Sequence, residues 1–222
     1  MIITLSRQLG SSGDIIAARV SAALGLSLVD REVVFRAALA AGVPEERLQK
    51  LMYHGVRSLA GEILDALGAT PGSLGEGPRP LPNPLGGLLA PMLMPANLDL
   101  DEVVKMIGLI VKDLANQGDV LVLGQGGQMS LRGFSGVCHV QVLAPLQQRV
   151  ARIVGLEGVN QGEARRLIRA SDESRATYLA RYYGSNWLDP LLYHLIINTG
   201  QTSVESAVSL IVHAALAVRT VD

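Results

Sequence analysis

The sequence predicts a three-layer α/β domain, in which a parallel sheet of about five strands is covered by helices on both faces. Two observations lead to this fold class. Short apolar segments alternate with longer segments of helical period along most of the chain. Two of the short segments, 119–123 and 137–143, are largely apolar along their whole length, which is typical of strands buried on both faces of a parallel sheet.

The composition fits one domain, or one domain with an inserted subdomain. The chain has 222 residues, of which 49% are hydrophobic, so it can bury a core without disulfides or metals. A formal net charge of −1 argues against binding to a nucleic acid polymer. The single cysteine, Cys138, excludes an internal disulfide framework and indicates a reducing compartment, and the scattered histidines offer no zinc spacing.

The sequence contains no recognisable targeting signal or membrane span. Residues 1–5 lack a basic segment, and their apolar run is short. The longest charge-poor region, 81–98, is interrupted by four prolines and falls short of the ~20 apolar residues that cross a bilayer. We therefore expect a soluble cytoplasmic protein that does not bind membranes.

The first half of the chain is expected to alternate strands and helices. Glycine, proline and acidic residues mark where the helices begin and end. The expected elements are a strand at 2–5, a loop at 8–13, a helix ending at Gly25, a strand at 26–29, a helix at 31–41 and a helix beginning at Pro44.

Residues 68–97 differ from the rest, because they hold seven of the ten prolines and many glycines. This composition predicts an extended loop rather than a folded domain. Its part at 81–98 is too apolar for a solvated linker, so we expect it to pack on the domain or on a second subunit. The prediction that follows is a homodimer.

The second half returns to regular alternation. The expected elements are a helix from Asp99 to Leu114, strands at 119–123 and 137–143, helices at 146–154 and 160–182, a strand at 192–197 and a helix at 203–218. Strands that alternate with helices in this way predict a parallel sheet with helices on both faces.

The strongest local signal is the strand, small-residue loop and helix at residues 2–24. A loop rich in glycine and serine that leads into a helix presents backbone N–H groups to an anion, and Gly10 and Gly13 permit close approach. The loop departs from the phosphate-loop pattern G-x-x-x-x-G-K-[ST], because Gly13 stands at the lysine and Asp14 at the hydroxyl residue. An ordinary turn between a strand and a helix is the alternative.

A second group of residues has the spacing of an arginine clamp. Steps of three place Arg169, Asp172 and Arg175 along one side of a helix. Two guanidinium groups held by a carboxylate match the oxygens of a phosphoryl group in transfer. The alternative is a ladder of surface ion pairs.

A third group follows from the ends of the predicted strands. Arg7, Asp30 and Gln125 each follow or end a strand, and ligands of open α/β sheets bind beyond the carboxyl ends of strands. The three segments are therefore expected to converge on one site.

Together, these motifs resemble those of the cytidylate kinase-like proteins, relatives of bacterial cytidylate kinase among the P-loop nucleoside monophosphate kinases. The matching segments are 3–13 (ITLSRQLGSSG), 30–32 (DRE), 122–126 (VLGQG), Arg149, 182–184 (YYG) and 195–199 (LIINT). The resemblance covers most of the chain except roughly residues 55–100. It implies a single P-loop kinase-like domain over 1–222, with 31–118 as an inserted acceptor-side helical region that includes the loop at 68–97.

The resemblance also implies roles for individual residues. The lid would supply Arg169, Asp172 and Arg175 for catalysis, while Asp30, Arg36 and Gln125 would bind the acceptor. The donor phosphates would be bound by Arg7, Gln8, Gly10, Ser11, Ser12, Gly13 and Asp14. The implied reaction is phosphoryl transfer from ATP, with Mg²⁺, to a nucleoside monophosphate, of which CMP and dCMP are favoured.

Three positions depart from the family pattern. Cytidylate kinases have lysine where this chain has Gly13, their relatives commonly have arginine at Asp14, and both have arginine at Gln125. Phosphoryl transfer depends on positive charge around the γ-phosphate. Other arginines could compensate, or Asp14 could hold Mg²⁺. Two further functions stay open: a catalytically impaired nucleotide- or partner-binding protein, and a kinase for a non-nucleotide acceptor.

Overall fold

The computed structural model describes residues 1–48 and 99–218, and its centre is a five-stranded parallel sheet. The strands are β1 (Ile2–Arg7), β2 (Ser27–Val29), β3 (Val120–Leu123), β4 (Val137–Leu143) and β5 (Leu195–Asn198). Their order in the sheet is β2-β3-β1-β4-β5, with every neighbouring pair parallel. The first strand of the chain is therefore the middle strand of the sheet, and the loop after it lies at the centre of the carboxyl edge.

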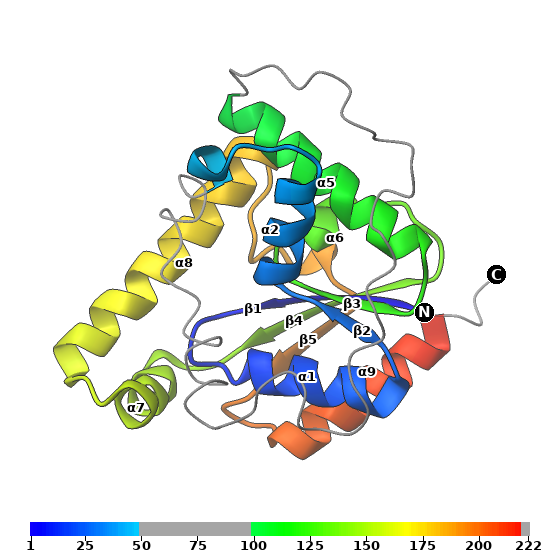
Figure 1. Ribbon diagram of the computed structural model, residues 1–222. Coiled ribbons are helices and arrows are strands. Elements are labelled where there is room, and N and C mark those ends of the chain that lie inside the picture. The colour runs from blue at the N-terminus through cyan, green and yellow to red at the C-terminus, as the bar shows by residue number, and fades with distance from the viewer. Residues whose placement is uncertain (49–98, 219–222) are drawn as a thin grey trace.

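Helices cover both faces of the sheet, which confirms the predicted α/β fold (Figure 1). One face packs on α1 (Gly13–Leu24) and α9 (Val204–Val218), and the other on α2 (Arg31–Ala40), α5 (Leu100–Asn116) and the short α6 (Gly127–Ser130). Strand residues alternate between the two cores: Ile3 and Leu5 face α1 and α9, whereas Val122 faces α5. This alternation explains why the strands are apolar at successive positions.

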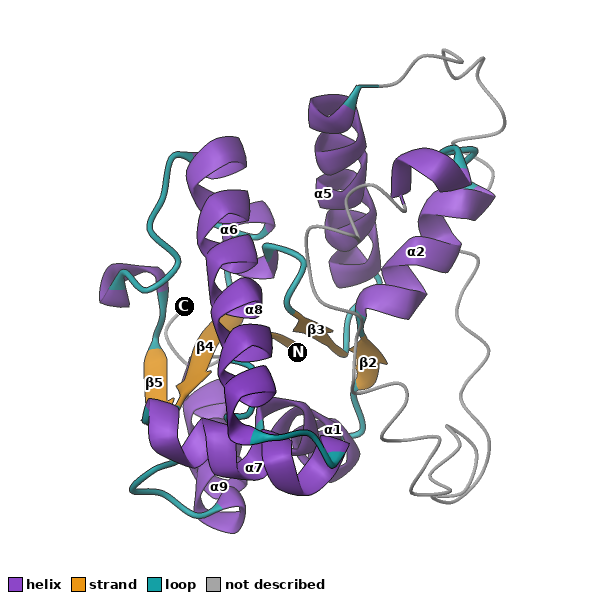
Figure 2. Cartoon of the chain, turned by 90° about the vertical axis from the view of Figure 1, so that its left-hand side faces the viewer, coloured by secondary structure: helices purple, strands orange, loops and turns teal. Residues whose placement is uncertain are grey.

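Two further helices form a hairpin beside the carboxyl edge of the sheet (Figure 2). They are α7 (Leu146–Glu157) and α8 (Gln161–Tyr183). A small core holds them together, in which Val150 and Ile153 of α7 meet Ala164 and Ile168 of α8. Leu9, from the loop after β1, packs against the same core, so the hairpin and the loop are in direct contact.

Local sequence signals account for the helix ends. Asp99 and Glu102 form a reciprocal capping box at the start of α5, where each side chain accepts the other's backbone N–H at 2.8 Å. At the start of α8, the Asn160 side chain accepts the N–H of Glu163, and α8 stops at Gly184, which has a φ of +61°. The helices predicted at 31–41, 146–154, 160–182 and 203–218 all lie within three residues of the observed ends.

One predicted strand begins later than expected. The apolar pattern predicted a strand from Leu192, but β5 starts at Leu195. The Asp189 side chain accepts the N–H of Leu191 and caps a short 3-10 helix at Pro190–Leu192. This helix includes Leu192, the first residue of the predicted strand. Helix α6, directly after the glycine-rich 124–126 turn, was not predicted.

Part of the sequence-based interpretation falls outside the described residues. The proline-rich segment at 68–97 and the apolar stretch at 81–98 belong to this part, so the homodimer stays a prediction. The helix expected from Pro44 begins at residues 45–48, where the description ends. The assignment of 31–118 as an inserted region likewise stays a prediction.

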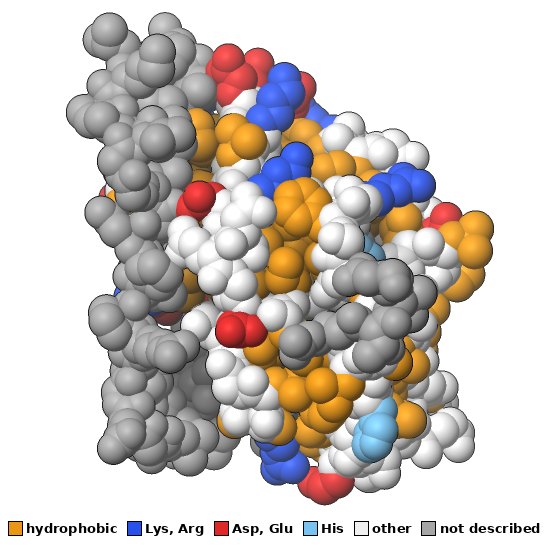
Figure 3. Space-filling model, turned by 90° about the vertical axis from the view of Figure 1, so that its right-hand side faces the viewer, with side chains coloured by type: hydrophobic (Ala, Val, Ile, Leu, Met, Phe, Trp, Pro, Cys, Tyr) orange, Lys and Arg blue, Asp and Glu red, His pale blue; other side chains and the backbone are white. Residues whose placement is uncertain are grey.

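The described helices include none that combines the length and apolar character of a bilayer-spanning segment. Figure 3 views the side of the molecule opposite to α7 and α8. The charged side chains visible there are scattered among apolar and neutral ones.

Candidate functional site

The loop between β1 and α1 bends sharply at two left-handed residues. Gly10 has a φ of +78° and Ser12 a φ of +63°. A Cβ atom at Gly10 would lie 2.9 Å from the Arg149 carbonyl oxygen, so only glycine allows α7 to approach the loop this closely. The loop is therefore shaped by contact with the α7–α8 hairpin as well as by its own sequence.

Four successive carbonyl groups of this loop accept hydrogen bonds from side chains. The pairs are Ser11 Oγ to Gln8 O at 2.8 Å, Arg149 Nη1 to Leu9 O at 3.3 Å, Arg152 Nη1 to Gly10 O at 3.1 Å, and Thr199 Oγ1 to Ser11 O at 2.8 Å. Gln8 adds a fifth contact, because its Oε1 accepts the N–H of Ala144 at 3.1 Å. These bonds hold the peptide planes of the loop in one orientation.

Several N–H groups of the same loop, unlike its carbonyl groups, have no hydrogen-bond partner among the described residues. Within residues 1–48 and 99–218, the amides of Gly10, Ser12, Gly13 and Asp14 donate to no protein acceptor. Ser11 N, which lies between them, donates to Gln8 O. Amides that remain available in a tight turn, next to the positive end of a helix dipole, suit the binding of an anion. These amides fit the predicted phosphate loop, whose role stays a prediction.

Arg7, the last residue of β1, lies across this loop. Its Nε and Nη2 donate to Asp14 Oδ1 at 3.1 and 2.9 Å. The side chain is only 16% exposed, whereas that of Asp14 is 36% exposed. A Cβ atom on Gly124 would lie 2.6 Å from Arg7 Nη1, so the guanidinium group reaches the carboxyl end of β3.

Two more arginines lie close to Arg7. The pKa of Arg175 is lowered to about 10, first by burial and then by the charge of Arg7, with a smaller lowering from Arg31, although Asp14 and Asp172 act to raise it. Burial and then the charge of Arg7 also lower the pKa of Arg31. Like charges that destabilise one another in this way are expected where an anion binds between them.

Arg175 is held in place by its own helix. Its Nη1 donates to the carbonyl oxygen of Ser171 at 3.0 Å and also contacts the Ser171 hydroxyl. Arg175 thus presents a fixed cation from α8 toward the loop that follows β1. The predicted lid arginine at this position and the predicted loop residues Arg7 and Asp14 come together in the structure.

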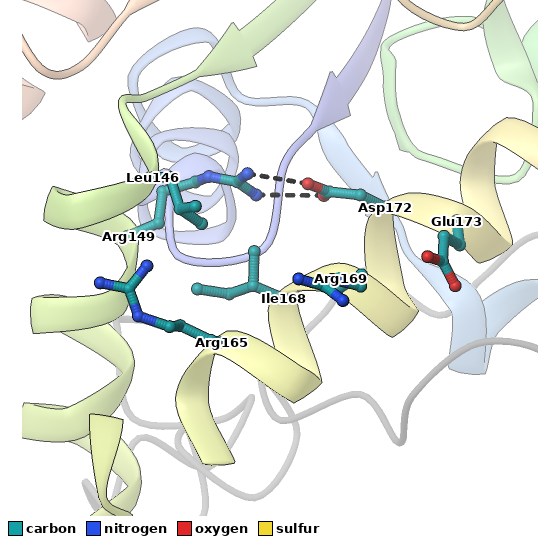
Figure 4. A pocket seen from close by; sticks show the side chains of 7 residues that line it. All are labelled: Leu146, Arg149, Arg165, Ile168, Arg169, Asp172 and Glu173. Carbon is teal, nitrogen blue, oxygen red and sulfur yellow. Dashed lines mark hydrogen bonds and ion pairs between the residues drawn. The ribbon is translucent and has the colours of Figure 1, made fainter. Parts of the chain in front are cut away.

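Asp172 and Arg169 have different surroundings from Arg175. Asp172 accepts two hydrogen bonds from Arg149 of α7, at 3.0 and 2.7 Å. Figure 4 shows this pair at one end of a pocket of about 230 Å³, with Arg165 and Arg169 near the other. The remaining lining residues are Leu146, Ile168 and Glu173. Arg169 is exposed and lines this pocket with Arg165.

The residues predicted to bind the acceptor are spread along the opposite side of the loop. The Asp30 side chain caps α2 by accepting Val33 N at 3.0 Å. Arg36 is exposed and lies 3.9 Å from Glu32 on the same helix. Gln125, with a φ of +56°, is the second residue after β3 and directly follows Gly124, which Arg7 approaches.

Sequence reasoning missed two residues that shape the loop. Arg152 bonds the loop at Gly10 and also donates to Thr199, at 3.1 Å to Oγ1 and 2.8 Å to the carbonyl oxygen. Thr199 in turn bonds Ser11 O. The one available signal was the position of Thr199 directly after the last strand, at the same edge of the sheet as Arg7.

Comparison with known families decides the assignment. The model of the cytidylate kinase-like family matches residues 2–201. This chain belongs to the cytidylate kinase-like family. Membership supports a nucleotide kinase-like role for the chain.

Solved structures extend the comparison of this cytidylate kinase-like protein. An uncharacterized protein from Eubacterium ventriosum superposes with a TM-score of 0.67 at 16% identity, over 98% of each chain, which shows a shared fold. A shikimate kinase from Bacteroides thetaiotaomicron gives a TM-score of 0.46 at 13% identity, over 95% of this chain and 96% of the other.

Among curated proteins, a uronate isomerase from Corynebacterium glutamicum is 30% identical over 102 residues, or 46% of this cytidylate kinase-like chain. The chain spans about a fifth (20%) of the length of that relative.

Proposed function

We propose that this protein is a cytoplasmic kinase that transfers the terminal phosphoryl group of ATP to a nucleoside monophosphate, with CMP or dCMP as the favoured acceptor. The observation that supports the proposal is the convergence at one place of four available loop amides and the arginines Arg7 and Arg175. Fixed N–H dipoles and guanidinium groups suit the charge that spreads over a phosphoryl group during transfer.

In the proposed reaction, an oxygen of the acceptor phosphate attacks the γ-phosphorus of ATP. A new P–O bond forms as the bond between the γ-phosphorus and the β–γ bridging oxygen breaks, and ADP leaves with that electron pair. A dianionic acceptor phosphate needs no general base. The protein's part is to hold the two phosphates in line and to neutralise their charge.

The residues near the loop fit Mg²⁺ only in part. Within the described residues, no group of three or more His, Cys, Asp or Glu side chains could hold a metal ion. Mg²⁺ bound with nucleotide needs only one or two carboxylates besides phosphate oxygens and water, and Asp14 is the carboxylate in the loop. Asp14 already accepts two bonds from Arg7 through one oxygen. When bound with ATP, Mg²⁺ would neutralise charge on the β- and γ-phosphates.

A coupled assay of ADP release tests the proposal directly. The acceptors are CMP, dCMP, UMP, AMP and GMP, each with ATP and Mg²⁺, and a reaction without acceptor measures background hydrolysis. The proposal predicts turnover with CMP or dCMP above the other three. Turnover with none of the five, in protein shown to bind ATP, would contradict it.

A second candidate is a catalytically impaired protein that keeps nucleotide binding. The ion pair between Arg7 and Asp14 favours it, because a carboxylate at the phosphate loop repels bound phosphates and offsets part of the positive charge of Arg7. In that case ATP binds but no acceptor yields ADP. A kinase for a non-nucleotide acceptor is the third candidate, and turnover with a small phosphorylated or hydroxylated metabolite but none of the nucleotides would favour it.

We also propose a homodimer in which the apolar segment at 81–98 is buried. Residues 81–98 are largely apolar and contain no charged residue, and exposed patches of this kind are uncommon in monomers. Light scattering during gel filtration gives the mass in solution. A monomeric mass across the accessible concentration range would contradict the dimer.

A further inference from the structure

Arg7 occupies a slot between two glycines. A Cβ atom at Gly13 would lie 2.4 Å from Arg7 Cβ and 2.8 Å from Arg7 Cγ. At the other end, a Cβ atom at Gly124 would lie 2.6 Å from Arg7 Nη1. The stem of Arg7 therefore runs over the first residue of α1, and its head lies at the end of β3. Any larger residue at 13 would displace the stem.

Asp14 fixes the direction of the guanidinium group. Its Oδ1 accepts from both Nε and Nη2, so one edge of the group is bonded to the first turn of α1. The remaining nitrogen, Nη1, is the atom nearest to Gly124. A charged pair with two hydrogen bonds has a defined orientation that a single contact would not give. The side chain is thus held across the loop rather than free in solvent.

The position of this slot matters for chemistry. β1 and β3 are neighbours in the sheet, with Leu5 beside Leu123, so Arg7 and Gly124 extend the two strands at the carboxyl edge. The available amides of Gly13 and Asp14 lie where the same loop joins α1. In an open α/β sheet this edge is where ligands bind. An anion bound by the loop amides would therefore lie on the side of the loop that Arg7 crosses.

We infer that Arg7 is the cation that contacts the terminal phosphates of the donor in place of the absent lysine, and that Asp14 is its positioning residue. The inference rests on the proposed phosphoryl transfer. It joins two departures from the phosphate-loop pattern into one arrangement: Gly13 makes room for the Arg7 stem, and Asp14 orients the Arg7 head. The charge that lysine supplies from α1 comes here from the end of β1.

In this arrangement the Arg7 guanidinium neutralises charge on the oxygens of the γ-phosphate and of the leaving diphosphate, while the bond changes stay as described above. No proton passes through Arg7, because a guanidinium group stays protonated at neutral pH. Asp14 acts only through Arg7.

The test compares four variants of the full chain with the wild type. Arg7→Ala removes the cation, Asp14→Asn keeps the shape of the positioning residue without its charge, and Asp14→Glu restores the charge. Arg19→Ala is the matched control, because Arg19 is an exposed arginine on α1 that pairs with Glu205 away from the loop. Circular dichroism and thermal melting check that each variant is folded.

Two measurements separate the inference from the proposed function. Titration calorimetry with inorganic pyrophosphate measures anion binding without chemistry, and ADP release with the accepted nucleotide measures turnover. We expect Arg7→Ala to weaken pyrophosphate binding at least tenfold and to lower kcat by two to three orders of magnitude. Asp14→Asn should lower kcat more than it raises KM for ATP, and Asp14→Glu should recover part of the loss. Arg19→Ala should match the wild type.

The outcomes are distinguishable. If the wild type binds pyrophosphate through Arg7 but forms no ADP, the Arg7 assignment stands and the proposed function fails. If turnover and pyrophosphate binding are unchanged in Arg7→Ala, the assignment is wrong while the function stands. If Arg7→Ala does not fold, equal kcat in Asp14→Asn and the wild type overturns the positioning role. A wild type that binds neither ATP nor pyrophosphate overturns both.

Discussion

Arg149 and Asp172 join helices α7 and α8 through an ion pair with two hydrogen bonds, at 3.0 and 2.7 Å. The Arg149 side chain is 6% exposed and that of Asp172 is 26% exposed. Arg149 also donates to Leu9 O in the loop between β1 and α1. One guanidinium group thus connects the two helices of the hairpin to the loop.

Breaking this pair should destabilise the protein. Asp172→Asn leaves the buried Arg149 charge without its partner, and we expect the free energy of unfolding to fall by about 3 kcal/mol. Urea denaturation measures the change. The control is Arg166→Ala, which removes an exposed pair with Glu163 on the same helix and should change stability little. Equal losses of unfolding free energy in the two variants would show that the pair between α7 and α8 stabilises the protein no more than an exposed ion pair does.

The two lid arginines should differ in their effect on turnover. Arg175 lies near Arg7 and Asp14, whereas Arg169 is exposed beside the pocket shared with Arg165. We expect Arg175→Ala to lower kcat by two to three orders of magnitude and Arg169→Ala to lower it by about tenfold or less. Steady-state kinetics with ATP and the accepted nucleotide give both values.

The opposite ranking, with Arg169 the more important, would mean that the α7–α8 hairpin moves when substrate binds. If neither substitution affects a robust turnover, the lid has been assigned to the wrong residues. In an impaired protein, Arg175→Ala would change nucleotide affinity alone.

Restoring the missing lysine by itself should not help. In Gly13→Lys the new side chain meets the Arg7 stem, since its Cβ would lie 2.4 Å from Arg7 Cβ. We expect weaker pyrophosphate binding in Gly13→Lys than in the wild type. In the double variant Arg7→Ala/Gly13→Lys, the space is free and binding should exceed that of either single variant. Calorimetry on the three variants checks this, and additive losses would refute it.

Stability should fall at mildly acidic pH because of the buried histidine His139. Burial, and then the charge of His194, lower the pKa of His139 to about 4 from 6.5. The His139 ring lies 2.8 Å from Thr4 Oγ1, measured from its Nδ1, and stacks on His194 at 5.2 Å. The folded protein therefore binds fewer protons at this site than the unfolded chain.

A lowered folded-state pKa gives a stabilisation that is complete above pH 6.5 and is lost as the pH falls toward 4. A shift of this size corresponds to roughly 3 kcal/mol. Urea denaturation between pH 7.5 and 4.5 measures the loss in the wild type and in His139→Gln, which does not titrate. The variant should lose less stability over this range, and parallel curves would exclude His139 as the cause.

The sequence was most informative where local signals and burial agree. β4 has the predicted bounds of 137–143, because a strand covered on both faces is largely apolar along its length. The start of α5 followed from Asp99 and Glu102, whose capping geometry is local. The 3-10 helix at Pro190–Leu192 was missed since its apolar residues read equally well as a strand.

The candidate site was only partly predictable for a physical reason. Loop glycines and arginines can be read from one segment, and the residues at 7–14 were identified in this way. Three of the four side chains that bind the loop carbonyls come from α7 and from the turn after β5, more than 130 positions away in the chain. No spacing rule links Arg152 to Gly10, and only the folded sheet edge brings them together.

The slot between Gly13 and Gly124 bears on how phosphate-binding chains are recognised. A motif search that demands lysine at position 13 would discard this sequence, although a cation lies across the same loop from the strand side. The diagnostic feature is then a relation among distant positions: arginine ending the first strand, glycine where its stem passes, an acid beside it, and glycine where its head arrives. Sorting related sequences by these four positions would distinguish two groups. In one group an arginine on the first strand replaces the loop lysine, and in the other the loop has no such cation.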